Sequence, residues 1–405
     1  MLNTYPEFIA IDFFCGAVGT TRGLIDAGGY VAAGVDNASD CLETFENNNI
    51  NLDGSKSKYL QRDIFEKSET YPSGEQDVLV GEIEDILLPL RQKYPKAPTL
   101  FSICAPCQPF TNLSRGELSE ARSESRIRDR NLLEQSLNFI SHFDPDLIFC
   151  ENVAGIQNKK YGGVWGEFLS KLEALGYVTG STIANTMNFG VPQMRKRSII
   201  LAVRKSNFNG LNSTITNGMD AIKMPENDGT GVVRTVRDVI SHLPPIAAGE
   251  THPVIKNHKC SNLSDINMRR ISMLEPGQSN IAFEGTDMQL ACHTRVRTKK
   301  NSKKGFSDSY TRMSNDKPAP TITTKCFSFS NGRFGHPDVK QNRALSVREA
   351  AAIQTFPDNY EFYASSIQKS AKMVGNAVPP LLATFFALEL VKMFKEKEIE
   401  ISKAA

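Results

Sequence analysis

The sequence predicts an α/β protein in which apolar strands alternate with helices. Residues 8–14 (FIAIDFF) form an apolar, β-prone run, a glycine turn follows, residues 20–27 have helical character, and residues 30–35 form a second apolar run. Strand, glycine turn, helix and strand in this order make one βαβ unit. The character changes after Arg204, because residues 204–231 are polar and rich in Asn, Gly and Thr, as at a domain boundary.

Composition excludes several classes of protein. The chain has 405 residues, 40% hydrophobic and 23% charged, which is typical of a soluble globular protein of two or three domains. We find no run of about 18 apolar residues and no basic N-terminal region, so we expect neither a membrane span nor a signal peptide. Eight cysteines, mostly in apolar runs, indicate reduced thiols in the cytoplasm. Because the net charge is only +2, a polyanion would have to bind to a local basic patch and not to the protein surface as a whole.

The glycine turn and two strand ends predict a nucleotide-like cofactor. The second strand ends in Asp36, twenty residues after Gly16, where a carboxylate can accept hydrogen bonds from ribose hydroxyls. A third strand ends near residues 60–64 and carries Asp63 at its tip. A dinucleotide would satisfy the same pattern, and so would a tight turn without any ligand.

The strand at residues 99–104 ends in Ala105-Pro106-Cys107-Gln108-Pro109-Phe110. Prolines on both sides place Cys107 on a stiff loop at a sheet edge, which suits a nucleophile. An inert core thiol is one alternative. A redox or zinc pair with Cys104 is another, but the chain has no second C-x-x-C and no histidine pair with zinc spacing, so we expect no metal. Pro109 follows too closely for the helix that a redox pair opens.

The next segments predict a mobile loop and a carboxylate. Residues 78–90 predict a helix, and residues 111–130, with five arginines and no apolar periodicity, predict a solvated loop that could close over a phosphate-bearing substrate. Residues 132–143 predict a helix, and a strand at 145–150 ends in Glu151. Partial desolvation there favours a general acid, although Glu151 could merely cap the next turn.

Two arginines follow on a later strand. Residues 164–175 predict a helix, and residues 177–184 and 198–203 predict strands. Arg195 and Arg197 would point the same way at strand period. This pair indicates either a solvated surface or two ligands for an anion or carbonyl beside a bound base.

The region from 204 to 340 has an irregular pattern and contains one dense basic run. Residues 293–304 hold six basic residues and no acid, which fits nucleic-acid backbone contact, while the alternative is a solvated face. These residues are Arg295, Arg297, Lys299, Lys300, Lys303 and Lys304. Residues 343–356 and 381–394 predict helices, and we find no internal repeat.

Together these segments resemble the DNA (cytosine-5) methyltransferase family. The matching blocks are DFFCGAVG at 12–19, PCQPF at 106–110, ENV at 151–153, QMRKR at 193–197, RALSVREAAAIQTFP at 343–357 and GNAVPP at 375–380. They occur in the family's order and cover the whole chain. The chain departs from the family at Val18, where glycine is usual, and conservatively at Thr111, where serine is commoner.

The resemblance implies a Rossmann-like S-adenosylmethionine-dependent methyltransferase domain with a doubly wound, mostly parallel sheet. Residues 1–203 plus 365–405 would form this domain, and residues 204–364 a smaller, irregular target-recognition domain. It also implies methylation of carbon 5 of a cytosine within a specific sequence of double-stranded DNA. We further expect a monomer in the cytoplasm, associated with the nucleoid, that accompanies a restriction endonuclease or another defence system.

The resemblance assigns roles to individual residues. Cys107 would attack carbon 6 of a flipped cytosine, Glu151 would hold or protonate ring nitrogen 3, and Arg197 with Arg195 would bind the ring carbonyl and brace Glu151. The positions that match the cofactor pocket are Phe14, Gly16, Asp36, Asp63, Ile64, Asn376 and Val378. Three alternatives stay open, namely a tRNA cytosine-5 methyltransferase, a catalytically silent DNA-binding relative and a C-x-x-C oxidoreductase.

Overall fold

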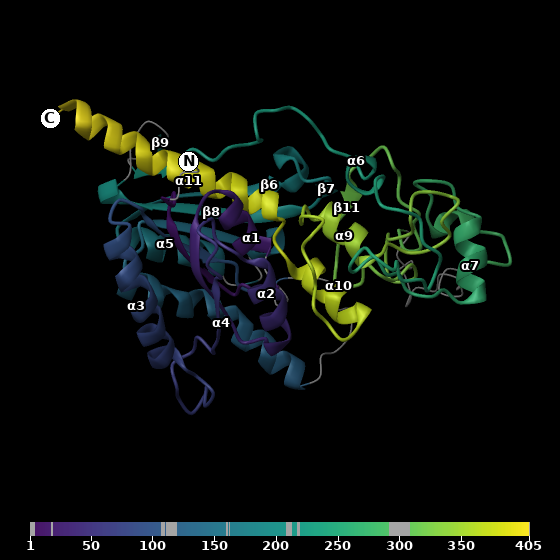
Figure 1. The fold of residues 1–405 in the computed structure, drawn as a ribbon, viewed down its shortest axis with the longest axis horizontal. Coiled ribbons are helices and arrows are strands. Elements are labelled where there is room, and N and C mark those ends of the chain that lie inside the picture. The colour runs from purple at the N-terminus through teal and green to yellow at the C-terminus, as the bar shows by residue number, and fades with distance from the viewer. Residues whose placement is uncertain are drawn as a thin grey trace, which may run out of the picture. The chain divides into compact units, whose positions relative to one another are not determined.

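A seven-stranded sheet organises the larger part of the computed structural model (Figure 1). Its strand order is β3-β2-β1-β4-β5-β8-β6. The first five strands of that order pair in parallel, whereas β8 is antiparallel to both β5 and β6. The strands are β1 (Ile9–Phe13), β2 (Tyr30–Asp36), β3 (Lys58–Gln61), β4 (Thr99–Ile103), β5 (Leu147–Val153), β6 (Tyr177–Asn185) and β8 (Lys196–Arg204). The predicted doubly wound, mostly parallel sheet is confirmed.

The structure describes residues 5–17, 19–106, 110, 120–158, 161, 163–207, 213–216, 219–290 and 308–404, without the side chains of 120–127, 213–220 and 395–404. The chain divides into two units. The sheet unit comprises Met1–Phe189, Lys196–Gly231 and Val378–Ala405, and the second unit comprises Gly190–Arg195 and Val232–Ala377. The predicted boundaries at 204 and 365 therefore lie elsewhere, at 231/232 and 377/378.

The boundary lies later than 204 because a hairpin continues the sheet unit. Strands β9 (Ser213–Thr216) and β10 (Met219–Ile222) pair antiparallel, and β10 packs on β6. The approach is close at Gly180, where a Cβ atom would lie 2.7 Å from the Ile222 carbonyl oxygen. Polar composition at 204–231 thus marked a surface hairpin and not yet the boundary.

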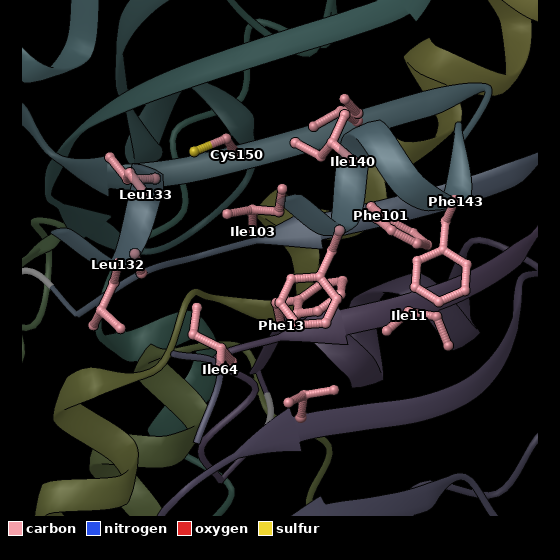
Figure 2. Close-up of a cluster of buried hydrophobic side chains, with 14 of the residues drawn as sticks. Ile11, Phe13, Ile64, Phe101, Ile103, Leu132, Leu133, Ile140, Phe143 and Cys150 are labelled. Atoms are coloured by element: carbon pink, nitrogen blue, oxygen red, sulfur yellow. The ribbon is translucent and has the colours of Figure 1, made fainter. Parts of the chain in front are cut away.

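Helices cover both faces of the sheet, because successive side chains of each strand point to opposite faces. On one face, α3 (Gln76–Lys93), α4 (Glu120–Phe143) and α5 (Val164–Ala174) bury the main core against the strands. Figure 2 shows this core, with Phe13 and Phe101 of the strands near Phe143 of α4. The Phe13 ring lies 5.2 Å from the Phe101 ring.

On the other face, α1 (Gly19–Asp26) packs against α11 (Pro380–Ala404). Gly23 makes this crossing possible, since a Cβ atom there would lie 2.3 Å from the Pro380 carbonyl oxygen. The Thr384 hydroxyl donates to the Gly23 carbonyl at 2.9 Å. Phe386 of α11 stacks on Phe149 of β5 at 6.1 Å. The C-terminal segment therefore completes the sheet unit, although it lies at the opposite end of the chain from α1.

Two helices of the sheet unit differ from the sequence expectations. Helix α2 (Leu42–Asn48) had no predicted counterpart. Helix α4 begins at Glu120, so residues 120–130 are helical and the predicted solvated loop is wrong for them. Apolar periodicity is absent there because the residues that hold this part of α4 are polar, as the contacts of Arg128 and Asn131 show below. The remainder of that predicted loop, 111–119, lies outside the described residues.

The second unit consists of short elements joined by turns, as the irregular pattern predicts. They are β7 (Gln193–Met194), β11 (Ala319–Pro320), α6 (Arg237–Ile240), α7 (Asp265–Ser272), α9 (Val347–Ile353) and α10 (Ile367–Asn376). Ser346 and Glu349 form a capping box at the start of α9. Burial opposes ionisation of Glu349, but hydrogen bonds from Arg343 and His336 outweigh it and hold the pKa of this carboxyl well below its ordinary value.

One helical stretch of the described chain, Ile367–Phe394, is long and apolar enough to cross a membrane by length and composition alone. Of its most apolar window, 61% is buried inside the protein. A core helix of a soluble protein passes the same test, so this finding is weak evidence for a span. The stretch also combines two helices, α10 and α11.

Candidate active site

The glycine turn after β1 exposes main chain at the carboxyl ends of two parallel strands. Gly16 has φ +52°, a left-handed conformation that favours glycine, and its amide donates to Asp36 Oδ2 at 2.9 Å. The amide of Ala38 donates to Asp36 Oδ1 at 2.9 Å. Phe14, with φ +59°, is half-buried beside the turn. Asp36 is thereby fixed at the end of β2, as predicted.

A second carboxylate lies at the end of the neighbouring strand. β3 pairs in parallel with β2, with Gln61 opposite Asp36, and Asp63 follows two residues later. Asp63 is buried, and its carboxylate accepts hydrogen bonds from the Ser73 hydroxyl at 2.8 Å and the Phe65 amide at 3.3 Å. Ile64 is buried next to it. Parallel strands thus bring two carboxylates and an open glycine turn to one sheet edge.

The remaining two residues predicted for the cofactor pocket come from the C-terminal region. Val378 is buried and belongs to the sheet unit, whereas Asn376 is exposed and belongs to the second unit. Gly375 before them approaches Thr323 so closely that a Cβ atom would lie 2.3 Å from its carbonyl carbon. The glycine of GNAVPP is therefore required by packing.

Glu151 and Arg197 meet inside the sheet unit. β5 and β8 pair antiparallel, with Glu151 opposite Ile199 and Val153 opposite Arg197. Arg197 Nε lies 2.7 Å from Glu151 Oε1, and the two side chains are 10% and 8% exposed. Among the described residues no hydrogen-bond donor is aligned with Glu151 Oε1, so the contact is an ion pair without good hydrogen-bond geometry. A buried carboxylate in this state can take a further donor.

Residues that follow Glu151 hold both sides of the Cys107 segment. Asn152 is fully buried, and its amide nitrogen donates to the Ala105 carbonyl at 3.0 Å. A Cβ atom on Gly155 would lie 2.5 Å from the Phe110 carbonyl oxygen, so only glycine permits this approach. Cys107 itself lies outside the described residues. Its flanks, Ala105 and Phe110, are both held by the chain just after Glu151.

Arg195 makes contacts other than those predicted. It is buried, and its terminal nitrogens donate to the carbonyls of Ile322 at 3.0 Å, Gly375 at 3.3 Å and Ala377 at 3.3 Å. The chain is not one continuous strand there, because β7 ends at Met194 and β8 begins at Lys196. Strand alternation therefore does not apply across Arg195. The basic run from Arg295 to Lys304 lies outside the described residues.

One buried carboxyl group, that of Asp12, escaped the sequence analysis. Asp12 on β1 is fully buried, its Oδ2 accepts from the Thr21 hydroxyl at 2.6 Å, and Oδ1 has no hydrogen-bond partner in the described chain. Burial, reinforced by Asp36, raises the pKa of Asp12 to about 7. Burial, with Glu151 and Asp12 nearby, also raises the pKa of the Cys104 thiol well above its ordinary value. Such a thiol is a poor redox partner, which counts against the C-x-x-C oxidoreductase.

Comparison with known proteins shows which family and which relatives the chain is similar to. The model of the family described as C-5 cytosine-specific DNA methylase matches residues 8–392. The Type II methylase M.HgiDII of Herpetosiphon aurantiacus is 34% identical over 394 residues, covering 95% of each chain. The Type II methyltransferase M.AgeI of Thalassovita gelatinovora is 25% identical and covers 95% of this chain and 99% of its own.

Solved structures show the same fold. A protein encoded within an Escherichia coli prophage, described as a candidate DNA modification methyltransferase, superposes with a TM-score of 0.62 at 19% identity. The alignment covers 96% of this chain and 99% of that one. At this identity the likeness concerns the fold alone.

Proposed function

The chain belongs to the C-5 cytosine-specific DNA methylase family, and we propose that Cys107, Glu151 and Arg197 carry its chemistry. The members it resembles are Type II methylases, which supports methylation of one cytosine within a specific DNA sequence. The tRNA alternative is not favoured, since neither the family nor these relatives is named for RNA. The silent DNA-binding alternative is not favoured either, because Glu151 and Arg197 are in contact.

The proposed reaction begins with the Cys107 thiolate, which forms a bond to carbon 6 of a cytosine taken out of the duplex. The electron pair of the ring double bond moves toward the ring nitrogen and carbonyl. Glu151 stabilises that charge by holding a proton at ring nitrogen 3, while Arg197 fixes the orientation of Glu151. After carbon 5 is methylated, loss of its proton and β-elimination of the cysteine restore the ring.

The methyl donor we propose is S-adenosylmethionine, which supplies an electrophilic methyl group when bound. The open main chain at Gly16 and the carboxylates of Asp36 and Asp63 fit its nucleoside part. Asp36 would accept hydrogen bonds from the ribose hydroxyls, and Asp63, one strand further along the sheet, would accept one from the adenine amino group. Phe14, Ile64, Asn376 and Val378 would complete the pocket.

We assign recognition of the target sequence to the second unit, with phosphate contacts from the basic run that includes Arg295, Arg297, Lys299, Lys300, Lys303 and Lys304. A run of six Lys and Arg residues that includes a single Asn, Asn301, suits backbone contact better than base readout. We retain Arg195 as a proposed member of the site, although its known contacts are with backbone carbonyls of the second unit. We also propose a monomer in the cytoplasm, on the nucleoid, that is paired with a restriction endonuclease or defence system.

The observation that carries this proposal is that Asn152 and Gly155, just after Glu151, contact Ala105 and Phe110 on either side of Cys107, the first by a hydrogen bond and the second by close packing. The test is bisulfite sequencing of DNA from cells that express the protein. We expect one cytosine of one short sequence to be protected throughout the genome. Protection should disappear with Cys107→Ala. Unprotected DNA from cells that contain folded protein would contradict the proposed function.

A further inference from the structure

Residues 63–76 form a loop that closes on itself and fixes Asp63. The Glu75 amide donates to the Asp63 carbonyl at 3.0 Å, and the Gln76 amide donates to the Phe65 carbonyl at 3.1 Å. The Asp63 amide in turn donates to the Glu75 carboxylate at 3.1 Å. Gly74 allows this closure, because a Cβ atom there would lie 2.4 Å from the Phe65 carbonyl oxygen. The backbone of Asp63 is therefore held before any ligand binds.

The Asp63 carboxylate is held unevenly. Its Oδ2 accepts from Ser73 and also forms an ion pair with Arg128 of α4. Its Oδ1 accepts only the long, 3.3 Å bond from the Phe65 amide within the described chain. The Asp63 side chain is 9% exposed and that of Arg128 is 36% exposed. Because a carboxylate offers about four lone-pair positions, Oδ1 keeps capacity for a further donor.

Helix α4 contacts the same loop at three points within one turn. Besides its ion pair, Arg128 lies over the Phe65 ring, 5.1 Å from its centre. Phe65 stacks on Tyr71 at 3.9 Å, and the Asn131 side chain donates to the Tyr71 hydroxyl at 3.0 Å. An isolated surface ion pair stabilises little, but this one ends on a buried carboxylate and is supported by stacking. This part of α4 is thus attached to the loop that bears Asp63.

We propose that Arg128 positions Asp63 so that Oδ1 accepts the adenine amino group of the cofactor, and that it thereby couples cofactor binding to α4. The inference rests on the proposed function and adds a positioning residue to it. Arg128 and Ser73 hold Oδ2, which restricts rotation of the carboxylate and leaves Oδ1 to accept from the ligand. By linkage, a ligand that orders Asp63 must also stabilise the contact between Asp63 and α4. No sequence motif marks Arg128, which stands among five interspersed arginines.

The test measures two dissociation constants by calorimetry for each protein variant. One ligand is S-adenosylhomocysteine, and the other is its analogue in which hydrogen replaces the adenine amino group. For the wild type, loss of the amino group should weaken binding about tenfold or more, as expected for a hydrogen bond to a charged acceptor. For Arg128→Ala, this ratio should fall below about threefold, because Asp63 is no longer oriented. Arg128→Lys keeps the charge without the planar fork and should give an intermediate ratio.

Arg62→Ala is the matched control. Arg62 precedes Asp63 and has a similar side-chain exposure of 31%. It pairs with Glu82 at 2.6 Å and with Glu75 at 3.8 Å, and not with the Asp63 carboxylate. For Arg62→Ala, the ratio of the two dissociation constants should equal that of the wild type. If Arg128→Ala weakens both ligands equally, or leaves the ratio unchanged, the inference is wrong. If S-adenosylhomocysteine does not bind the wild type at all, the proposed function itself fails.

Hydrogen exchange gives a second readout that does not depend on turnover. In the wild type, S-adenosylhomocysteine should slow amide exchange in residues 63–76 and also in residues 128–143 of α4. In Arg128→Ala, ligand at saturating concentration should slow exchange in the loop but no longer in α4. Equal slowing of α4 in both proteins would overturn the coupling.

Discussion

At the scale of single residues, the site is defined by a buried carboxylate with one cationic neighbour. Glu151 lies within β5, and Arg197 reaches it from the antiparallel strand β8. The pair satisfies the charge of Glu151 but leaves Oε1 without an aligned donor in the described chain. A cytosine ring nitrogen that gains a proton during attack would supply that donor. This unfilled acceptor is what the proposed catalytic role of Glu151 requires.

Glu151→Gln tests this role. The amide keeps the shape but removes the charge and the titrating proton, so single-turnover methyl transfer should slow by about a hundredfold or more. Binding of S-adenosylhomocysteine should change little. Glu134→Gln is the control, because Glu134 makes an exposed ion pair with Lys171 and should leave the rate unaltered. A Glu151→Gln enzyme with near wild-type rate would remove Glu151 from the mechanism.

Asp12 is a buried carboxyl group that the proposed chemistry does not use. Burial raises its pKa to about 7, from an ordinary value of 3.8. In the unfolded chain Asp12 ionises above pH 3.8, whereas in the folded protein it stays protonated until about pH 7. The contribution of protonated Asp12 to the free energy of unfolding is therefore fully present below pH 3.8 and is lost as the pH rises toward 7. The shift corresponds to a cost on the order of 4 kcal/mol at most.

Asp12→Asn should remove that cost, because the amide is neutral at every pH and still accepts from Thr21. We expect urea unfolding to show the variant more stable than the wild type at pH 8 by about 1–4 kcal/mol, with the difference vanishing near pH 4. Asp26→Asn, at a more exposed ion pair with Arg22, controls for loss of a carboxylate. A difference that does not depend on pH would show that Asp12 is not protonated in the folded protein.

At the scale of elements, strands and their ends were predictable from the sequence, whereas polar helices were not. The runs at 8–14, 99–104 and 145–150 correspond to β1, β4 and β5, because both faces of these strands are buried and the whole run is apolar. The carboxylates at the strand ends follow directly from that pattern. Strand alternation failed at Arg195, where the chain breaks between β7 and β8.

Helix α4 illustrates why the rest could not be predicted. Its first part lacks apolar periodicity, and contacts of Arg128 and Asn131 with residues distant in sequence hold it. The sequence analysis also missed helix α10, although its buried residues Ala371, Met373 and Val374 give it an apolar face. The position of Asn152 next to Glu151 is evident from the sequence. Its hydrogen bond to the Ala105 carbonyl is not, because only the structure shows the direction of the Asn152 side chain.

The crossing of α1 and α11 gives a prediction about stability. Gly23→Ala would place a Cβ atom 2.3 Å from the Pro380 carbonyl oxygen and 2.7 Å from the Ala383 Cβ, so the helices must separate. We expect the free energy of unfolding, from urea titration, to fall by about 2–3 kcal/mol.

Gly81→Ala in α3 is the opposite case. Nothing lies within 4 Å of a Cβ atom there, and alanine favours a helix, so stability should rise by about 0.5–1 kcal/mol. If Gly23→Ala does not lower stability while Gly81→Ala raises it, the close crossing of α1 and α11 is not present in solution.

At the scale of the whole molecule, the chain consists of a regular and an irregular unit. The sheet unit fixes carboxylates and glycine turns at strand ends, and it is assembled from both ends of the sequence. The second unit is held by buried side chains such as Arg312, which donates to the carbonyls of Leu274 and Ile271, both at 2.7 Å. Such carbonyl-directed packing leaves no periodic pattern, so the fold of this unit does not follow from the sequence.

The central claim is that Cys107 forms a covalent bond to cytosine carbon 6, and trapping tests it most directly. DNA of long, mixed sequence is synthesised with 5-fluorocytosine, so that a target site is present although its sequence is unknown. Attack and methylation can proceed, but elimination cannot, because fluorine does not leave as a cation. With S-adenosylmethionine, the wild type should give a complex that survives denaturing electrophoresis. Cys104→Ser should do the same, whereas Cys107→Ser should not. A stable complex with Cys107→Ser, or none with wild type that methylates ordinary DNA, would contradict the account.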